Sequence, residues 1–397
     1  MVWAGTHAAS FNKAEQGLQA LGELEVSDQR VRRATVGIGD EVVAQRDAEV
    51  AQFEAMPIPE QRKSPAAATP KLAVVEMDGG RMQYRDRHAA EEVPEATEVD
   101  GRKGRFWRET KVGVLLTGAS QVSAEDPCPR IPEAFLDRRK IPRMCREIKG
   151  IATAADEATI ADEAISVQNG SQRAGQPEPL VRSVVATRRD VHEFGRLLAA
   201  SAWRRGFYAA ERKAFLGDGL EQNWTVWRRH FSDFVPILDF VHALCYVYAA
   251  ALAGRTFMAG WSVYAQWAQW IWSGRVELVI AALAARKTEL GLPAEGEPET
   301  SPPCVVADAL RYFENQRERM HYDEYRRQGL PLTTAHVESV IKQIGRRVKG
   351  TEKFWSAGGE ALLALSAAYL SETQPMERFW ANRTATRTGH RHYSCAA

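Results

Sequence analysis

The chain has 397 residues, of which 45% are hydrophobic and 26% are charged. This length favours two domains, or one domain with a large insertion, and the composition excludes a chain that is disordered throughout. Because 52 lysines and arginines are balanced by 51 aspartates and glutamates, a histone-like polycation is also excluded, and any contact with nucleic acid must come from local basic surfaces.

The five cysteines are scattered, without the close pair that marks a zinc site or a disulfide framework. This pattern favours a reducing compartment, and the first ten residues lack the basic start and apolar stretch of a secretory signal. The most apolar region, 240–285, is interrupted by charged and amide side chains too often for a membrane span. We therefore expect a cytoplasmic protein that does not contact a membrane.

Residues 1–70 are predicted to form a region of short helices that ends in a linker. Residues 18–35 are typical of a helix, a tight turn and a second helix, with Ser27 placed to cap the second helix and three arginines near its start. A helix-turn-helix that binds DNA is one interpretation, and a capped helix pair unrelated to DNA is the other. The proline- and alanine-rich stretch 57–70 is the expected linker.

From residue 71 the patterning changes to that of a sheet. The runs LAVVEMDGG, RMQYRDR and ETKVGVLLTG predict three consecutive antiparallel strands. After an irregular or partly helical excursion over 119–180, we expect a helix over 188–205, a buried strand KAFLGDG, a helix over 223–230 and a strand FVPILD that runs into a helix. Three strands, then helix, strand, helix and strand, is the order of an RNase H-like core, whose first part would span 71–240.

The remaining segments are predicted to be helical. Residues 241–330 are expected to form an α-helical insertion with a break at 292–303, and residues 331–383 return to the core with helices over 335–348 and 358–370. The tail, 384–397, is expected to be flexible. The expected fold class is therefore α/β: an RNase H-like mixed sheet flanked by helices, interrupted by an α-helical insertion and preceded by a helical N-terminal region.

Three acids are candidates for a metal site. Asp78 and Asp218 each end a buried strand and precede a glycine, and Glu338 lies in the first turn of the helix over 335–348. Taken singly, an Asp-Gly step forms turns and a glutamate in a first helical turn compensates the helix dipole. Neighbouring strands would nevertheless bring both aspartates to one end of the sheet. Carboxylates suit Mg²⁺, and two such ions about 4 Å apart can activate a nucleophile and stabilise a leaving oxygen in phosphodiester cleavage.

A family resemblance strengthens this hypothesis. The stretch GLPLTTAHVESVIKQIGRRVKGTEKFW, with RYFENQRERMHYDEYRRQ before it and GGEALLALSAAYLSE after it, resembles the C-terminal signature of the Kra-type insertion-sequence transposases, a DDE group. The blocks VVEMDGG with ETKVGVLLTG and FLGDGLEQNW with FVPILDFVHAL also match, so the resemblance spans about 72–381. It implies that Asp78, Asp218 and Glu338 form the catalytic, metal-binding triad, with two Mg²⁺ or Mn²⁺ ions as cofactors.

The resemblance also implies an activity and its partners. The activity is metal-dependent cleavage at insertion-sequence ends and strand transfer into target DNA, by a homo-oligomer in a synaptic complex on the nucleoid, with no organic cofactor. The partners are double-stranded DNA with terminal inverted repeats and the target duplex. Three alternatives stay open: an RNase H-like nuclease that cuts without joining, an inactive or truncated relic that only binds DNA, and a helical scaffold that does not bind nucleic acid.

Two departures from the family pattern bear on these alternatives. Thr333, Thr334 and Ala335 stand where family members commonly have glycine and serine. A separate end-recognition region, often with paired cysteines, is also expected ahead of the catalytic domain, and nothing before Cys128 can supply such a pair. The second departure favours a truncated copy.

Further residues are candidates of a weaker kind. Asp239 and His242 are similar to the acid, two residues, histidine signature of several DDE groups; a catalytic His242 and a structural pair are the two interpretations. The tryptophans of the insertion are expected to pack in its core, with stacking on an unpaired base as the alternative. These tryptophans are Trp261, Trp267, Trp270 and Trp272. His390, His392 and Cys395 in the tail are expected to be incidental rather than a metal site.

Basic residues that flank the third acid are the expected DNA contacts, because phosphate contacts would hold a DNA end in register. Solvated helix faces are the alternative explanation for any one run. The candidates are Arg317, Arg319, Arg326, Arg327, Lys342, Arg346, Arg347 and Lys349.

Overall fold

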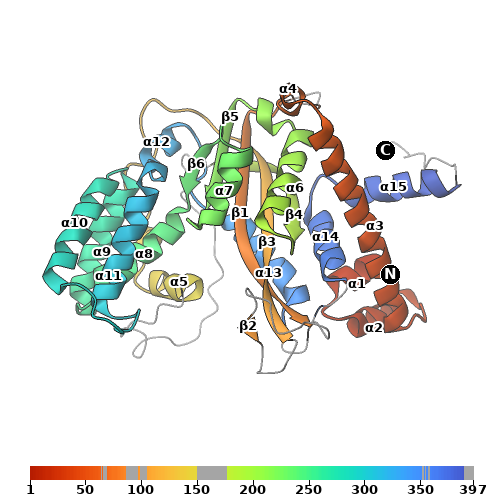
Figure 1. Cartoon of the computed structure of the whole chain (residues 1–397), viewed down its shortest axis with the longest axis horizontal. Helices are drawn as coiled ribbons and strands as arrows, with labels where there is room; N and C mark the ends of the chain where they lie inside the picture. Colours follow the sequence, from red (N-terminus) through yellow and green to blue (C-terminus); the bar gives the residue numbers. More distant parts are fainter. Residues whose placement is uncertain are drawn as a thin grey trace.

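A mixed sheet stands in the middle of the molecule (Figure 1). The computed structural model describes residues 1–63, 65, 69–85, 97–98, 105–149, 177–350, 353, 355 and 358–388. The strands are β1 (Leu72–Arg85), β2 (Thr97–Glu98), β3 (Arg105–Ala119), β4 (Glu178–Thr187), β5 (Arg212–Gly217) and β6 (Val235–Leu238). Their order is β2-β3-β1-β5-β6, and β4 pairs with the second half of β3. β3 is antiparallel to all of its neighbours, whereas β1, β5 and β6 are parallel to one another.

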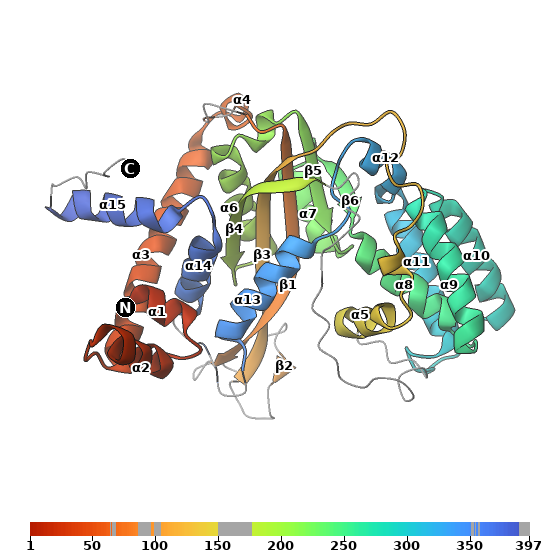
Figure 2. The ribbon, with the colours of Figure 1, turned by 180° about the vertical axis from the view of Figure 1, so that it is seen from behind.

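Helices cover both faces of this sheet. α6 (Val191–Arg204) and α7 (Glu221–His230) lie on one face, and α13 (Ala335–Val348) and α14 (Gly359–Leu370) lie on the other (Figures 1 and 2). Residues 72–77 of β1 are therefore all buried, and five of the six are apolar, as expected for a strand with both faces covered. Gly113 of β3 allows α6 to pack closely, because a Cβ there would lie 2.6 Å from a methyl carbon of Leu198.

The N-terminal helices pack along one side of the core. They are α1 (Val2–His7), α2 (Phe11–Gly22), α3 (Asp28–Ala55) and α4 (Ile58–Gln61). Ser27 caps α3 as predicted, accepting a hydrogen bond from the Arg30 backbone N–H. The prediction of short helices is wrong for α3, which is a single helix of 28 residues. Gly39 allows its close contact with α14, because a Cβ there would lie 2.6 Å from the Ala361 Cβ.

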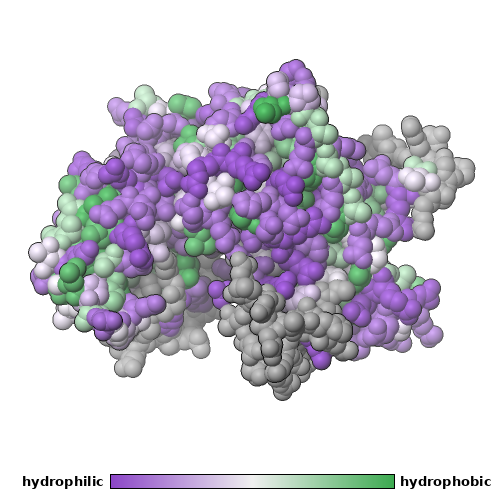
Figure 3. Space-filling view, in the orientation of Figure 1, coloured by the Kyte–Doolittle hydropathy of each residue, from purple (hydrophilic) through white to green (hydrophobic). Residues whose placement is uncertain are grey.

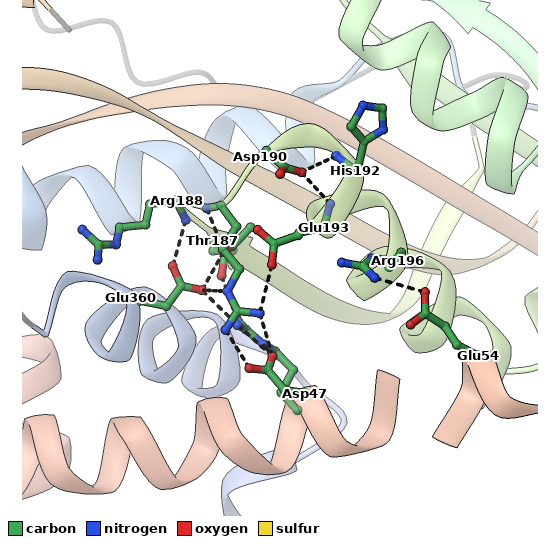
Figure 4. A network of polar contacts seen from close by, with 12 residues as sticks. Asp47, Glu54, Thr187, Arg188, Asp190, His192, Glu193, Arg196 and Glu360 are labelled. Carbon is green, nitrogen blue, oxygen red and sulfur yellow. Dashed lines mark hydrogen bonds and ion pairs between the residues drawn. The ribbon is translucent and has the colours of Figure 1, made fainter. Parts of the chain in front are cut away.

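A half-buried carboxylate ties α3 to the sheet (Figure 4). Glu360 of α14 accepts hydrogen bonds from the Thr187 hydroxyl (2.6 Å), the Arg188 backbone N–H (2.9 Å) and the Arg46 guanidinium of α3 (2.9 Å). Beside it, Arg189 donates two hydrogen bonds to Asp47 of α3, a geometry that fixes orientation as well as distance. The N-terminal helices are thus held to the end of β4 by charge as well as by packing.

The segment 241–330 forms a group of helices beyond the β6 edge of the sheet (Figure 1). It contains α8 (Phe240–Leu252), α9 (Phe257–Trp272), α10 (Val276–Leu290), α11 (Pro302–Gln316), a 3₁₀ turn over Arg317–Arg319 and α12 (Tyr322–Arg327). α5 (Lys140–Lys149), from the excursion, packs against α8. The core interpretation of the tryptophans is confirmed: Trp261, Trp267 and Trp272 are at most 5% exposed, and Trp270 packs against the same core.

Surface character differs between the sheet and the insertion. Seen from the side of α6 and α7, the surface over the sheet is mostly hydrophilic, with more hydrophobic residues toward the outer end of the insertion (Figure 3). Exposed leucines there include Leu278 and Leu292. Among the residues described, no helix combines the length and the apolar character needed to cross a membrane.

Several predicted elements match the structure, and, besides α3, three do not. The strands β5 and β6, the helical insertion and the helix over 335–348 lie where they were expected. However, LAVVEMDGG and RMQYR form one continuous strand, β1, so no turn follows Asp78. The third antiparallel strand is β4, which begins at Glu178 inside the predicted irregular excursion. Finally, α15 (Pro375–Thr388) continues into the tail predicted to be flexible, while residues 389–397, with His390, His392 and Cys395, lie outside the described residues.

Candidate metal centre

Three aspartates lie level with one another on neighbouring parallel strands. Leu216 of β5 pairs with Glu76 of β1, so Asp218, two residues further on, is level with Asp78. Gly217 of β5 pairs with Leu238 of β6, so Asp218 is also level with Asp239. We call Asp78, Asp218 and Asp239 the acid row. Sequence reasoning placed Asp78 and Asp218 at one end of the sheet; the strand register brings the two residues level, but Asp78 lies in the middle of β1.

Asp78 lies within β1 rather than at its end. Its carboxylate is half-buried, and Oδ1 accepts a hydrogen bond from the Gly79 backbone N–H at 2.6 Å. Burial raises the pKa of Asp78 to about 7; repulsion from Asp218 and Glu338 adds to the rise, and the Gly79 hydrogen bond and the charge of His242 oppose it. The charges of Asp218 and Glu338 thus act on the Asp78 carboxyl group, with burial as the larger effect.

Asp218 is held by the turn that follows β5. Its Oδ1 accepts hydrogen bonds from the Leu220 backbone N–H at 3.0 Å and from the Asn223 side-chain amide at 2.6 Å. Gly219 adopts a φ of 100°, and a Cβ at this position would lie 2.8 Å from the Tyr312 ring. The LGDG motif therefore needs its second glycine for both backbone conformation and space.

Asp239 is fully buried and joins two helices. Its Oδ1 accepts from the Val241 and His242 backbone N–H groups at the start of α8, at 2.6 and 3.4 Å. Its Oδ2 accepts from the Thr334 backbone N–H at 3.0 Å and from the Thr334 hydroxyl, at the start of α13. Burial alone would raise the pKa of Asp239, but interactions with His242 and Thr334 hold it below its ordinary value. Asp239 is thus an ionised carboxylate with hydrogen bonds to both oxygens.

His242 is the cation of this group. Its Nδ1 lies 3.5 Å from Asp239 Oδ2, and its side chain is 13% exposed. Burial lowers the pKa of the imidazole, but the negative charges of Asp239, Asp218 and Asp78 outweigh burial and raise the pKa to about 9. His242 therefore carries a positive charge at neutral pH.

Glu338, on α13, lies close to Asp239 and His242. Ligand atoms of Asp239, His242 and Glu338 all lie within 4.8 Å of one another, the one such group among the described residues. Burial and the charge of Asp239 raise the pKa of Glu338, while His242 and Lys342 lower it. The structure thus brings Glu338 next to the pair that the sequence analysis left between a catalytic and a structural role.

The start of α13 is held by a second buried carboxylate, Glu76 of β1. This side chain accepts hydrogen bonds from the Val337 backbone N–H and from His336 Nδ1, each at 2.9 Å. Sequence reasoning missed Glu76, although a charged residue within the apolar run LAVVEM is a signal that could have found it. It also treated Thr334 only as a departure from a family pattern, whereas Thr334 connects Asp239 to α13.

The acids differ in whether both carboxylate oxygens already accept hydrogen bonds. Both oxygens of Asp239 accept hydrogen bonds, so we assign it to holding α8, α13 and His242 rather than to binding an ion. In contrast, Asp78 and Asp218 each accept hydrogen bonds at Oδ1, and within the described part of the chain neither Oδ2 nor the Glu338 carboxylate has a hydrogen-bond partner. Asp78, Asp218 and Glu338 therefore keep carboxylate oxygens of the kind that a hard divalent cation prefers. Among the described residues, however, Asp78 and Asp218 do not belong to the close group that Asp239, His242 and Glu338 form.

The structure separates the predicted DNA contacts. The prediction that Arg326 and Arg347 contact DNA is wrong, because both side chains are buried. Arg326 pairs with Asp126 and stacks on Trp272, and Arg347 donates two hydrogen bonds to the Gly5 carbonyl.

The other six candidates differ in how free their charge is. Arg319 is half-buried, stacked on Trp224 at 4.3 Å and hydrogen-bonded to Gln316. Arg317 and Arg327 pair with neighbouring acids. The remaining candidates are exposed on or just after α13: Lys342, Arg346 and Lys349.

No family model matches this chain, and neither does any of the curated proteins. The family resemblance therefore depends on the quoted sequence motifs. Any assignment of a function depends on the geometry of the acid row and of Glu338.

Proposed function

We propose that the chain is a divalent-metal-dependent enzyme that cleaves and joins DNA, a transposase of the DDE type built on an RNase H-like core. The observation that carries this proposal is the acid row, level on three neighbouring strands, with Glu338 of α13 beside it. Its chemistry is the hydrolysis of a phosphodiester bond and the transfer of a 3′-hydroxyl to target DNA.

The strand arrangement supports the RNase H-like core. β4, β3 and β1 are consecutive antiparallel neighbours, and β5 and β6 follow parallel to β1, with helices on both faces. This is the series of three strands, helix, strand, helix and strand expected from the sequence, with β4 in the place of the third strand. In this arrangement, the strands that carry Asp78 and Asp218 are adjacent.

Asp78, Asp218 and Glu338 would hold two Mg²⁺ or Mn²⁺ ions through carboxylate oxygens that accept no hydrogen bond within the described part of the chain. Burial, and then repulsion from neighbouring acids, raises the pKa values of Asp78 and Glu338, and a divalent cation would favour the ionised form of both. Such ions, when bound, make a water or a 3′-hydroxyl more nucleophilic and stabilise the leaving oxygen.

Residues behind the acids support the same chemistry. His242, charged at neutral pH, can donate a hydrogen bond to a phosphate oxygen, and Asp239 holds its imidazole in place. Lys342 and Arg346 follow Glu338 at intervals of four residues, so the three share one face of α13. Phosphates of double-stranded DNA, at a terminal inverted repeat or a target, could contact this basic face while the scissile bond reaches the acids.

The test is metal-dependent cleavage by the purified full chain. We expect nicking of supercoiled plasmid, or of duplexes from the DNA that flanks the coding region, only with Mg²⁺ or Mn²⁺. Asp78→Asn, Asp218→Asn and Glu338→Gln should each lower the rate at least about 100-fold, because each removes a ligand oxygen. Asp40→Asn, at an exposed acid of α3, is the matched control and should keep the full rate.

The alternatives give different results. Cleavage without strand-transfer product, when pre-cut ends, target DNA and Mn²⁺ are supplied together, would indicate a nuclease that does not join. Binding to DNA without cleavage by any form, including the unaltered chain, would indicate an inactive relic and would contradict the proposed activity.

A further inference from the structure

Tyrosine side chains from one segment of the insertion contact the strand ends that carry the acid row. The segment is residues 312–325, which covers the end of α11 and most of α12. The Tyr312 hydroxyl donates to the carbonyl oxygen of Asp218 at 2.9 Å, and the Tyr322 hydroxyl donates to the carbonyl of Leu238, immediately before Asp239, at 2.9 Å. Two of the three residues in the row thus receive backbone support from the same segment.

The outer edge of β6 explains two of these contacts. β6 is the last strand on its side of the sheet, so alternate carbonyls point away from β5 and need donors from elsewhere. Tyr322 supplies the donor for Leu238, and Tyr325, one helical turn later, supplies the donor for Pro236 at 3.2 Å. Pro236 itself has no N–H, which suits an edge strand. The tyrosine hydroxyls of α12 therefore donate the hydrogen bonds that a neighbouring strand would otherwise donate to these carbonyls.

The turn after β5 receives the other contacts. Tyr312 reaches the Asp218 carbonyl, and the Gln316 side-chain amide, one turn further along α11, donates to the Gly219 carbonyl at 3.0 Å. The Tyr312 ring also stacks on Tyr246 of α8, with ring centroids 3.7 Å apart. The turn that presents the Asp218 carboxylate is thus fixed from the backbone side by a packed helix.

We propose that Tyr312 and Tyr322 are positioning residues for the metal centre: Tyr312 holds the backbone of the ligand Asp218, and Tyr322 holds the backbone just before Asp239, which in turn holds Thr334 at the start of the helix that carries Glu338. This inference rests on the proposed metal-dependent function. It gives the insertion a role in the site: α11 and α12 brace the acid row from the side opposite β1.

The hydroxyl groups suit this role because they remain donors. Burial raises the pKa values of Tyr312 and Tyr322 well above the ordinary value, and the charges of nearby acids raise them further. Both phenols therefore remain donors near neutral pH. A carbonyl oxygen can only accept, so the direction of each hydrogen bond is fixed.

The experiment compares Tyr312→Phe and Tyr322→Phe with a matched control, Tyr264→Phe. The buried Tyr264 of α9 donates its hydroxyl to the Phe135 carbonyl at 2.8 Å, so the control loses the same atom and the same kind of hydrogen bond within the insertion. Mn²⁺ binding to the full chain is measured by calorimetry, together with the Mn²⁺ dependence of nicking. We expect the dissociation constant to rise about tenfold in the first two variants, as for other groups that orient ligands. It should be unchanged in the control.

The two measurements separate positioning from general destabilisation. Saturating Mn²⁺ should restore most of the nicking rate in Tyr312→Phe and Tyr322→Phe, since no ligand is lost. Equal Mn²⁺ affinity in the unaltered chain and in both variants would overturn the inference while leaving the metal site intact. Absence of Mn²⁺ binding by the unaltered chain would overturn the metal site and this inference with it. If Tyr322→Phe does not fold, Tyr312→Phe decides the outcome alone.

Discussion

The carboxyl group of Asp78 has a pKa of about 7, so its charge reduces the stability of the metal-free protein. Its folded pKa lies above its unfolded value, and the protonated form is therefore favoured by folding. The contribution is fully favourable below about pH 4 and is lost as the pH rises through 7. A divalent cation reverses this effect, because it binds the ionised form.

Asp78→Asn should therefore stabilise the protein against unfolding in a pH-dependent way. In the presence of a chelator, we expect the gain to be small near pH 4 and to reach about 4 kcal/mol at pH 8. Urea denaturation at both pH values measures it. With saturating Mn²⁺ at pH 8 the order should invert, since the variant has lost a ligand oxygen. An equal gain at both pH values would contradict the raised pKa.

Single residues also show where sequence reasoning stops. Asp218 and Glu338 could be found, because an Asp-Gly step after a buried strand and a glutamate in a first helical turn are local patterns. The burial of Arg326 and Arg347, in contrast, could not be predicted from local patterns. Their partners, Asp126 and the Gly5 carbonyl, lie 200 and 342 residues away in the sequence. Burial of an arginine is decided by such distant contacts, which a run of basic letters does not reveal.

At the scale of elements, the position of α13 decides where Glu338 lies. Two buried carboxylates hold its first turn: Asp239 through Thr334, and Glu76 through Val337 and His336. Carboxylates near a helix N-terminus interact favourably with its unpaired N–H groups and its dipole. The helix α13 is therefore fixed at the end that carries Glu338.

Glu76→Ala should loosen that end of α13. We expect the free energy of unfolding to fall by about 2 kcal/mol, because the buried Val337 N–H loses its acceptor, and Mn²⁺ affinity to fall as Glu338 moves. Glu76→Gln keeps one acceptor oxygen of the same shape, so its loss should be clearly smaller. Urea denaturation and Mn²⁺ calorimetry on both variants provide the comparison. Equal losses in the two variants would indicate that the charge of Glu76, and not the hydrogen bond to α13, is what matters.

The elements themselves were predictable where local signals agree. The helix over 335–348 was predicted with its observed bounds, because its turn residues and its apolar spacing indicate the same limits. The glycines after Asp78 gave a false turn signal, since Gly79 and Gly80 stay extended and pair with Lys111 and Thr110. Gly80 is needed for packing instead: a Cβ there would lie 2.7 Å from the Thr110 hydroxyl. β4 was missed although its β-branched run, VRSVVAT, was visible.

At the scale of the whole molecule, helices surround one sheet, and two of these helices, α13 and α3, present clusters of exposed basic residues. One surface is the exposed face of α13 and its end, with Lys342, Arg346 and Lys349. The other is the start of α3, where three exposed arginines lie on the second helix of the predicted helix-turn-helix. That helix pair exists, but α3 is a long helix tied to Glu360, so DNA binding by its first turns stays a prediction.

The salt dependence of DNA binding should distinguish the two surfaces. Each phosphate contact releases counterions and adds about one to the slope of log affinity against log salt concentration. Replacing Lys342, Arg346 and Lys349 together by alanine should therefore weaken binding to any duplex and reduce that slope by about three. Fluorescence anisotropy with a labelled duplex, over a range of salt concentrations in Ca²⁺ or chelator to prevent cleavage, gives both quantities.

The matched control replaces Arg30, Arg32 and Arg33 of α3 by alanine, which removes the same total charge from the other surface. If phosphates are held beside Glu338, the control keeps the original slope, because distant exposed charges are screened within about 10 Å at 0.1 M salt. A reduced slope in the control and an unchanged slope in the α13 variant would place the DNA on the N-terminal helices. The scissile bond would then have to reach the acid row without the basic face of α13, which would contradict the contact proposed for that helix.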